Sequence, residues 1–180
     1  MARMNPLKRE EMNEEQGKTY DLIAARGGRL GGPNGIYCRV PELFLLNQEI
    51  GDYLRDCGIS PRQRQIAVIT GCRYFGAEYP WAVQARAALG VGVERDVVEA
   101  INRGETPKLS GDDMLVYELA SELVRHGALS DASFAKGEKA FGSNSLMNLV
   151  AMVGFYTSVA LIANVFEVDV PGGIPIPLAK

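Results

Sequence analysis

The sequence predicts an all-α protein, and three observations lead to this fold class. Apolar residues recur at helical spacing in several segments along the chain. No segment shows the sustained apolar and polar alternation of a half-buried strand. Pro and Gly stand where helices would begin and end. We therefore expect a compact bundle of about six to seven helices, folded as one domain over residues 1–180.

Composition agrees with a globular domain and narrows the classes of partner. Hydrophobic residues make up 47% of the chain and charged residues 23%, which are ordinary values for a folded domain with a sizeable core. The net charge of −3 favours neither nucleic acid nor an anionic membrane as a partner. Residues 1–11 are polar and lack the apolar segment of a signal peptide. We expect these residues to form a mobile arm or to lie along a neighbouring surface, and the protein to be cytoplasmic.

Metal and disulfide sites are not expected. The three cysteines, Cys38, Cys57 and Cys72, form no Cys-x-x-Cys pair, and their odd number argues against a disulfide framework. His126 is the single histidine, which excludes a site built from several His ligands. We expect no metal and no cofactor, an inert packed thiol at Cys72, and a structural role for His126 at a helix end.

The first part of the chain predicts two helices joined by a glycine-rich stretch. The first helix spans about Glu14 to Arg26 and stops at Gly27-Gly28. Residues 27–40 lack the glycine spacing that binds phosphate, so we interpret them as a loop that crosses the surface. Pro41 begins the next helix, which ends at Gly58. Its expected apolar face consists of Leu43, Leu46, Ile50 and Leu54.

The central stretch, Ser60 to Gly90, predicts two short helices on either side of a tight corner at Phe75-Gly76-Ala77. Ser60 is a good N-cap, Pro61 suits the first helical position, and Gln63 is in capping-box register with the serine. The second helix begins near Glu78, and we expect Gly90 to end it in a left-handed conformation.

The remaining chain predicts three more helices. Gly104 closes a short one, and Ser110 with Asp113 provides the cap of the next. A short helical segment then starts at Ser130-Asp131.

The last predicted helix, about Ser145 to Phe166, is apolar nearly all round. Its length would allow a membrane span, but polar residues such as Asn148 and Asn164 interrupt it and no basic flank anchors it. We therefore expect no membrane insertion and a buried helix. A single small domain cannot easily enclose such a helix, which predicts a homo-oligomer. The tail, residues 167–180, is punctuated by proline and should be extended over a partner subunit.

The central stretch and its flanks resemble a known family. The segments GGRLGGPNGIYCRVPEL, VVEAINRGETP and NVFEVDVPGG surround it in order. Together they look like the carboxymuconolactone decarboxylase and alkylhydroperoxidase-D superfamily over nearly the whole chain. The resemblance implies a helical bundle assembled into trimers or hexamers, with the central helices lining a pocket. It also implies lyase chemistry in aromatic compound catabolism.

The chain departs from both branches of that superfamily. Where the peroxidase branch has Glu, Cys, Cys and His, this chain has Gln65, Ala77, Pro80 and Gln84. A disulfide-cycling peroxidase needs two neighbouring thiols, so we do not expect that activity. Against the decarboxylase-like branch, the segment 77–84 keeps the Glu, Tyr and Trp and loses a second Glu and both histidines.

Candidate catalytic residues follow from what that segment keeps. Glu78 is the only carboxylate left in the motif and could transfer a proton, with Tyr79 as its hydrogen-bonding partner. The alternative is a first-turn Glu that the helix dipole stabilises. Gln65 and Gln84 are neutral amides, which can position a ligand but cannot shuttle a proton. Trp81 would be a core or interface anchor or, as the alternative, a platform for substrate.

Four further residues complete the predicted binding site. Arg39, Tyr37, Arg73 and Arg86 could converge on an anionic ligand, since Arg binds carboxylates in a bidentate manner. Surface salt bridges are the alternative for each arginine. The leading hypothesis is a cofactor-independent acid-base enzyme acting on a small carboxylated or lactone compound. The alternative is a catalytically silent homologue that binds a small molecule or only assembles.

Overall fold

The computed structural model describes residues 3–170 and 172–180. Within those ranges the chain forms helices and no strand, so the predicted all-α class is confirmed. A 3-10 helix, Arg9–Glu11, precedes eight α-helices. The α-helices are α1 (Glu14–Ala25), α2 (Pro33–Tyr37), α3 (Pro41–Tyr53), α4 (Pro61–Tyr74), α5 (Glu78–Gly90), α6 (Arg95–Asn102), α7 (Gly111–His126) and α8 (Asp131–Val165).

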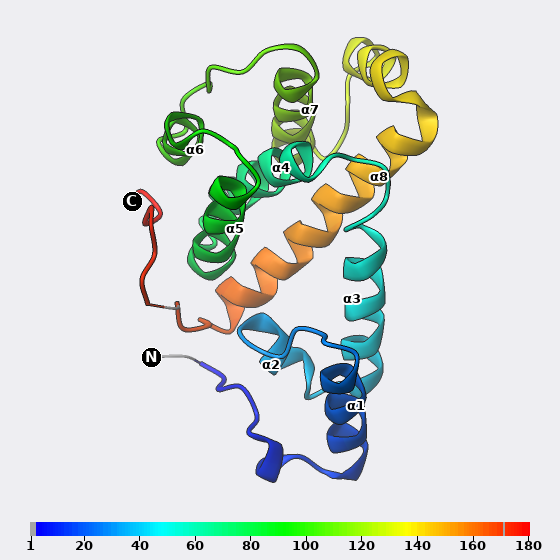
Figure 1. Ribbon diagram of the computed structural model, residues 1–180, viewed down its shortest axis with the longest axis vertical. Helices are drawn as coiled ribbons and strands as arrows, with labels where there is room; N and C mark the ends of the chain where they lie inside the picture. The colour runs from blue at the N-terminus through cyan, green and yellow to red at the C-terminus, as the bar shows by residue number, and fades with distance from the viewer. Residues whose placement is uncertain (1–2, 171) are drawn as a thin grey trace.

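Helix α8 divides the molecule into two sides. Figure 1 shows it running obliquely through the middle, with α4, α5, α6 and α7 on one side and α1, α2 and α3 on the other. Helix α4 packs against α5, α7 and α8. Fully buried apolar side chains from these four helices form the main core, among them Ile66, Ile69, Trp81, Leu119, Leu149 and Met152. This core holds in place the N-terminal turn of α5, on which the candidate site depends.

The boundaries of the central helices follow the sequence signals closely. Ser60 and Gln63 form the predicted capping box at the start of α4. Gly27 takes a left-handed conformation (φ 69°) just beyond α1. The end of α5 differs from the prediction: Gly90 is its last helical residue, and Gly92 is the left-handed glycine (φ 84°).

The cap predicted for α7 is also wrong. Ser110 precedes the helix but its side chain makes no capping hydrogen bond. Asp113 instead accepts a hydrogen bond from Arg62, with 2.6 Å between Nε and Oδ2. The N-terminal turn of α7 is therefore tied to α4 rather than to its own cap.

Helix α8 joins the two helices that the sequence predicts at the end of the chain. The break between them is Gly142, whose backbone (φ 75°, ψ 160°) is not helical. By length and composition alone α8 could span a membrane, and 33% of its most apolar window is buried inside the molecule. Much of this apolar helix is thus on the surface, contrary to the predicted full burial.

Helix α3 presents most of its predicted apolar face to solvent, and of the four predicted residues only Leu54 is buried. Leu43, Leu46 and Ile50 are each about half exposed. The buried residues are Phe44, Asn47, Gln48 and Gly51. Phe44 joins a small second core with Ile23, Tyr37 and Cys38, and the two amides hydrogen-bond to the segment before α3. Polar partners, and not the apolar period, therefore set the orientation of this helix.

The ends of the described chain pack on the chain itself. The Arg3 backbone N–H donates to the Phe166 carbonyl at 3.1 Å. In the tail, the Ile176 carbonyl accepts a hydrogen bond from Trp81 Nε1 at 2.8 Å, and the Pro177 carbonyl accepts one from Asn102 at 2.8 Å. The extended tail therefore covers α5 and α6 of its own subunit.

Candidate functional site

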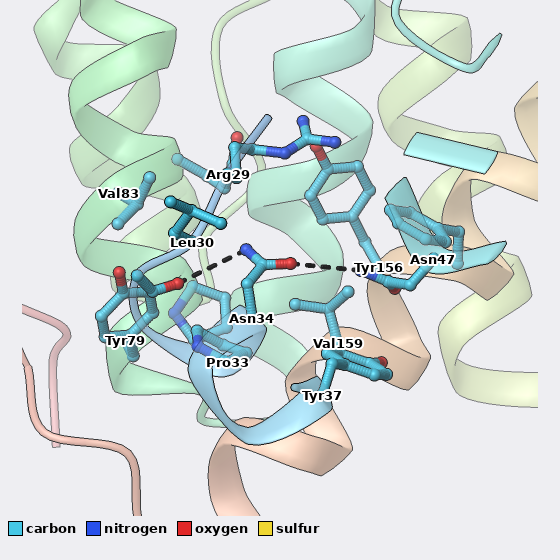
Figure 2. Close-up of a pocket in the computed structure, with 14 residues that line it drawn as sticks. Arg29, Leu30, Pro33, Asn34, Tyr37, Asn47, Tyr79, Val83, Tyr156 and Val159 are labelled. Carbon is cyan, nitrogen blue, oxygen red and sulfur yellow. Dashed lines mark hydrogen bonds between the residues drawn. The ribbon is translucent and has the colours of Figure 1, made fainter. Parts of the chain in front are cut away.

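A cavity of about 310 Å³ lies where α2, α5 and α8 meet the loop between α1 and α2. Figure 2 shows its lining side chains pointing toward one another from these elements. The lining residues are Arg29, Leu30, Gly31, Pro33, Asn34, Tyr37, Asn47, Tyr79, Pro80, Val83, Gln84, Phe155, Tyr156 and Val159. A cavity of this size with mostly apolar walls and a few polar groups is typical of a small-molecule site.

The glycine-rich stretch builds one wall of this cavity, which corrects its interpretation as a surface loop. It contains α2, whose Pro33, Ile36 and Tyr37 are buried. Gly32 lies against the ring of Tyr79: a Cβ atom added to it would be 2.0 Å from Tyr79 Cζ. Its backbone is also left-handed (φ 60°), so both the contact and the conformation require glycine.

A network of amides fixes this wall. The Asn34 Oδ1 atom accepts hydrogen bonds from Gln48 Nε2 at 2.9 Å and from Asn47 Nδ2 at 3.2 Å. Gln48 Nε2 also donates to the Arg29 carbonyl at 3.0 Å, and Gln48 Oε1 accepts from the Arg29 N–H at 3.2 Å. Gln48 and Asn47 are buried, and buried amides that find their partners hold a single arrangement.

The chemistry of the lining groups is that of hydrogen-bond donors. Arg29 is the one lining residue with a formal charge, and no carboxylate, thiol or imidazole lines the cavity within the described chain. Burial raises the pKa of Tyr79 and the pKa of Tyr156. Both phenols therefore keep their protons at neutral pH and can donate hydrogen bonds to a ligand.

Some of the predicted site residues meet in this cavity. Tyr37, Tyr79 and Gln84 line it, together with Pro80. Gln65 and Trp81 do not belong to the lining. Gln65 is buried in α4, and its Oε1 atom has no hydrogen-bond partner among the described residues. Trp81 is fully buried in the main core. This agrees with the predicted role as a core anchor and not with the alternative of a platform for substrate.

Glu78 is near the cavity in sequence but outside it in space. It is exposed and lines a separate groove that also contains Glu167 and Asp169. Tyr79 lines both the cavity and this groove, whereas Glu78 lines the groove alone. Burial therefore does not shield the Glu78 carboxylate from water.

The predicted arginines do not converge. Arg39 donates to the Asn5 carbonyl at 2.9 Å, and Arg86 donates to the Gly173 carbonyl at 2.6 Å. Arg73 donates to the Asn102 carbonyl and lines another cavity. The prediction of a shared anion site at these residues is wrong because each guanidinium binds a backbone carbonyl in a different part of the molecule.

Two of the three cysteines lack the properties of catalytic thiols. Cys38, Cys57 and Cys72 are all free. Burial raises the pKa of Cys38 to about 11 and the pKa of Cys72 to about 12. A nucleophilic cysteine has a lowered pKa and access to solvent, so the two buried thiols are unreactive, as predicted for Cys72.

Comparisons with known proteins identify the fold. No protein-family model matches the sequence, and no curated protein sequence matches it. A solved structure of the alkylhydroperoxidase AhpD core, an uncharacterized peroxidase-related protein from Ralstonia eutropha JMP134, superposes with a TM-score of 0.76. That match covers 98% of this chain and 97% of the other at 13% identity. The chain has the AhpD-like fold.

A second structure with the AhpD-like fold adds a bound ligand. The debrominase Bmp8, solved in complex with 2,3,4-tribromopyrrole, superposes with a TM-score of 0.73 at 12% identity. The match covers 93% of this chain and 90% of that one. These similarities confirm the fold that the resemblance implies. Sequence reasoning missed Arg29, Asn34, Asn47 and Tyr156, and the only signal for the first two was their place in the glycine-rich stretch.

Proposed function

We propose that this protein binds a small, flat, largely apolar molecule in the cavity between α2, α5 and α8. The observation that carries the proposal is the lining itself. Aromatic rings and aliphatic side chains form the walls, and fixed donors lie among them. Such a surface binds and orients a compound without supplying a nucleophile or a carboxylate base.

The structural neighbours support this class of ligand. The debrominase with the same fold was solved with a halogenated pyrrole, which is small, planar and apolar. The cavity of about 310 Å³ is within the range of small-molecule pockets. The aromatic side chains Tyr37, Tyr79 and Phe155 provide surfaces on which a flat ring can pack.

Binding can be tested with a cavity-filling variant. A panel of small aromatic acids, amides, phenols and lactones is screened by calorimetric titration and thermal shift. Val83→Trp, on the cavity wall, should abolish the binding of compounds that wild type accepts. Lys139→Trp, an exposed position on α8, is the matched control and should leave binding unchanged. Equal binding to wild type and Val83→Trp would place the ligand elsewhere and contradict the proposal.

An acid-base enzyme acting on a small carboxylated or lactone compound is the second candidate function. It is favoured by the position of Tyr79, which lines the cavity and keeps its proton at neutral pH because burial raises its pKa. A protonated phenol can deliver a proton to a developing oxyanion. Glu78, the neighbouring residue, could exchange that proton with solvent because it is exposed.

The two candidates differ in how turnover responds to conservative changes. If Tyr79 is the acid, Tyr79→Phe lowers turnover of an accepted substrate by about 100-fold or more. If Glu78 returns a proton to Tyr79 after each turnover, Glu78→Gln lowers turnover as well and leaves ligand binding intact. Glu118→Gln, an exposed position on α7, is the control. If compounds of the panel bind but none is turned over, the protein is a binding protein and not an acid-base enzyme.

The surface supports a proposal of homo-oligomers, trimers or hexamers. The outward side of α3 presents Leu43, Leu46, Ile50 and Tyr53, and α8 presents Met147 beside them. The Tyr53 hydroxyl donates to Asn148 Oδ1 at 2.9 Å, which joins the two helices into one surface. Large apolar side chains exposed along one helix in this way mark an interaction site. Light scattering should report more than one chain, and Leu46→Glu with Ile50→Glu should give a folded monomer.

A further inference from the structure

The site of Arg29 is fixed by its surroundings. Its backbone N–H and carbonyl are both hydrogen-bonded by the buried side chain of Gln48. Its guanidinium lies on Gly51 of α3, where an added Cβ atom would be 2.5 Å from Nη2. Because Gly51 has no side chain, the Arg29 guanidinium can occupy this position at the cavity wall. Arg29 is thus positioned before any ligand arrives.

The charge of Arg29 is only partly neutralised by the protein. Asp52 is the one carboxylate in ion-pair range among the described residues, with 3.5 Å between Oδ1 and Nη2. The same Oδ1 atom is 2.5 Å from Nη2 of Arg55. One carboxylate therefore faces two guanidiniums, and it is closer to the other one. Partial burial and, after it, repulsion from Arg55 lower the pKa of Arg29, although 43% of its side chain is exposed to solvent.

A second donor stands beside the guanidinium. Figure 2 shows the hydroxyl end of Tyr156 next to the guanidinium of Arg29 at one end of the cavity. Within the described chain, that hydroxyl makes no hydrogen bond to another protein group. The ring packs edge-on against Phe155, with 5.3 Å between centroids. The phenol is therefore held in place with its donor free for a ligand.

We propose that the cavity selects ligands that carry a carboxylate or a similar oxyanion, bound between the Arg29 guanidinium and the Tyr156 hydroxyl. The inference rests on the proposed binding function and names the chemical class of its ligand. The apolar part of the ligand lies against Val83, Val159 and the aromatic walls. The anion pairs with the part of the Arg29 positive charge that Asp52 does not neutralise. Asp52 competes with the anion for Arg29.

The test compares benzoate with benzamide, which has nearly the same shape and no charge. Calorimetric titrations use a buffer free of carboxylate and phosphate. Wild type should bind benzoate at least about 10-fold more tightly than benzamide, since hydrogen bonds to charged groups are the stronger ones. Arg29→Gln should remove this preference and change benzamide affinity by less than about 2-fold. Arg26→Gln, an exposed arginine just beyond α1, is the matched control.

Two further variants sharpen the result. Asp52→Asn should strengthen benzoate binding because it removes the carboxylate that competes for Arg29. If Asp52 had only a structural role, this substitution would not strengthen benzoate binding. Tyr156→Phe should weaken the affinity for benzoate by about 3- to 10-fold and should affect the affinity for benzamide less. If Arg29→Gln unfolds, Arg29→Lys keeps the charge without the planar fork and should give an intermediate preference.

The outcomes separate the inference from the function on which it rests. Benzamide binding as tightly as benzoate, in wild type and Arg29→Gln alike, overturns the anion site and leaves the binding function standing. Failure of every compound of the panel to bind wild type overturns both.

Discussion

The two sides of α8 are stabilised in different ways. On the side of α4, α5 and α7, apolar side chains such as Trp81, Leu119 and Met152 are fully buried around a continuous core. On the side of α1, α2 and α3, amide hydrogen bonds hold the helices, and leucines and an isoleucine of α3 face outward. The cavity lies between the two sides, with α5 on one wall and α2 and its preceding loop on the other. A core of apolar side chains thus stabilises the fold, while a network of polar side chains shapes the wall of the site.

The largest expected effect is on the core side. Trp81→Ala removes a fully buried ring and the hydrogen bond from its Nε1 to the Ile176 carbonyl. It should lower the free energy of unfolding by about 3–5 kcal/mol, measured by urea denaturation. A loss below about 1 kcal/mol would mean that this ring is not part of the cooperative core.

A smaller effect is expected at the cavity wall. Gly32→Ala forces a side chain into the Tyr79 ring and into a left-handed backbone, and should cost about 2–5 kcal/mol. Gly58→Ala is the matched control, since Gly58 is also left-handed (φ 86°) but has open space around it. That change should cost about 1–2 kcal/mol. Equal losses in urea melts would show that the contact with Tyr79 contributes nothing.

The side of α4, α5 and α7 was largely predictable from the sequence, and the side of α1, α2 and α3 was not. The capping box at Ser60 was predicted correctly because it depends on local contacts. The face of α3 was predicted wrongly because Asn47 and Gln48 find partners in α2 and its preceding loop, which no helical period reveals. Arg29 was missed for the same reason: its position depends on Gln48 and Gly51, both distant in sequence.

The effect of the buried thiols is the smallest at neutral pH and appears only in alkaline solution. In the unfolded chain a thiol ionises near its ordinary pKa of 9.0, whereas burial raises the pKa of Cys72 to about 12. The unfolded state then binds fewer protons, so the free energy of unfolding should be fully retained below pH 9.0 and fall as pH rises toward 12. Cys72→Ala should make this fall less steep in urea melts at several pH values. An unchanged slope would indicate that the thiol is accessible in the folded protein.

We expect the cavity between α2, α5 and α8 to bind a small acid. The most direct measurement is a benzoate titration followed by NMR of the valine methyl groups. Val83 and Val159 line the cavity, whereas Val97 and Val98 are buried in the main core. We predict saturable shifts at the first pair and none at the second, and the benzoate concentration at half-saturation should rise by at least about 10-fold in Arg29→Gln. Shifts absent from Val83 and Val159 at saturating benzoate would contradict it.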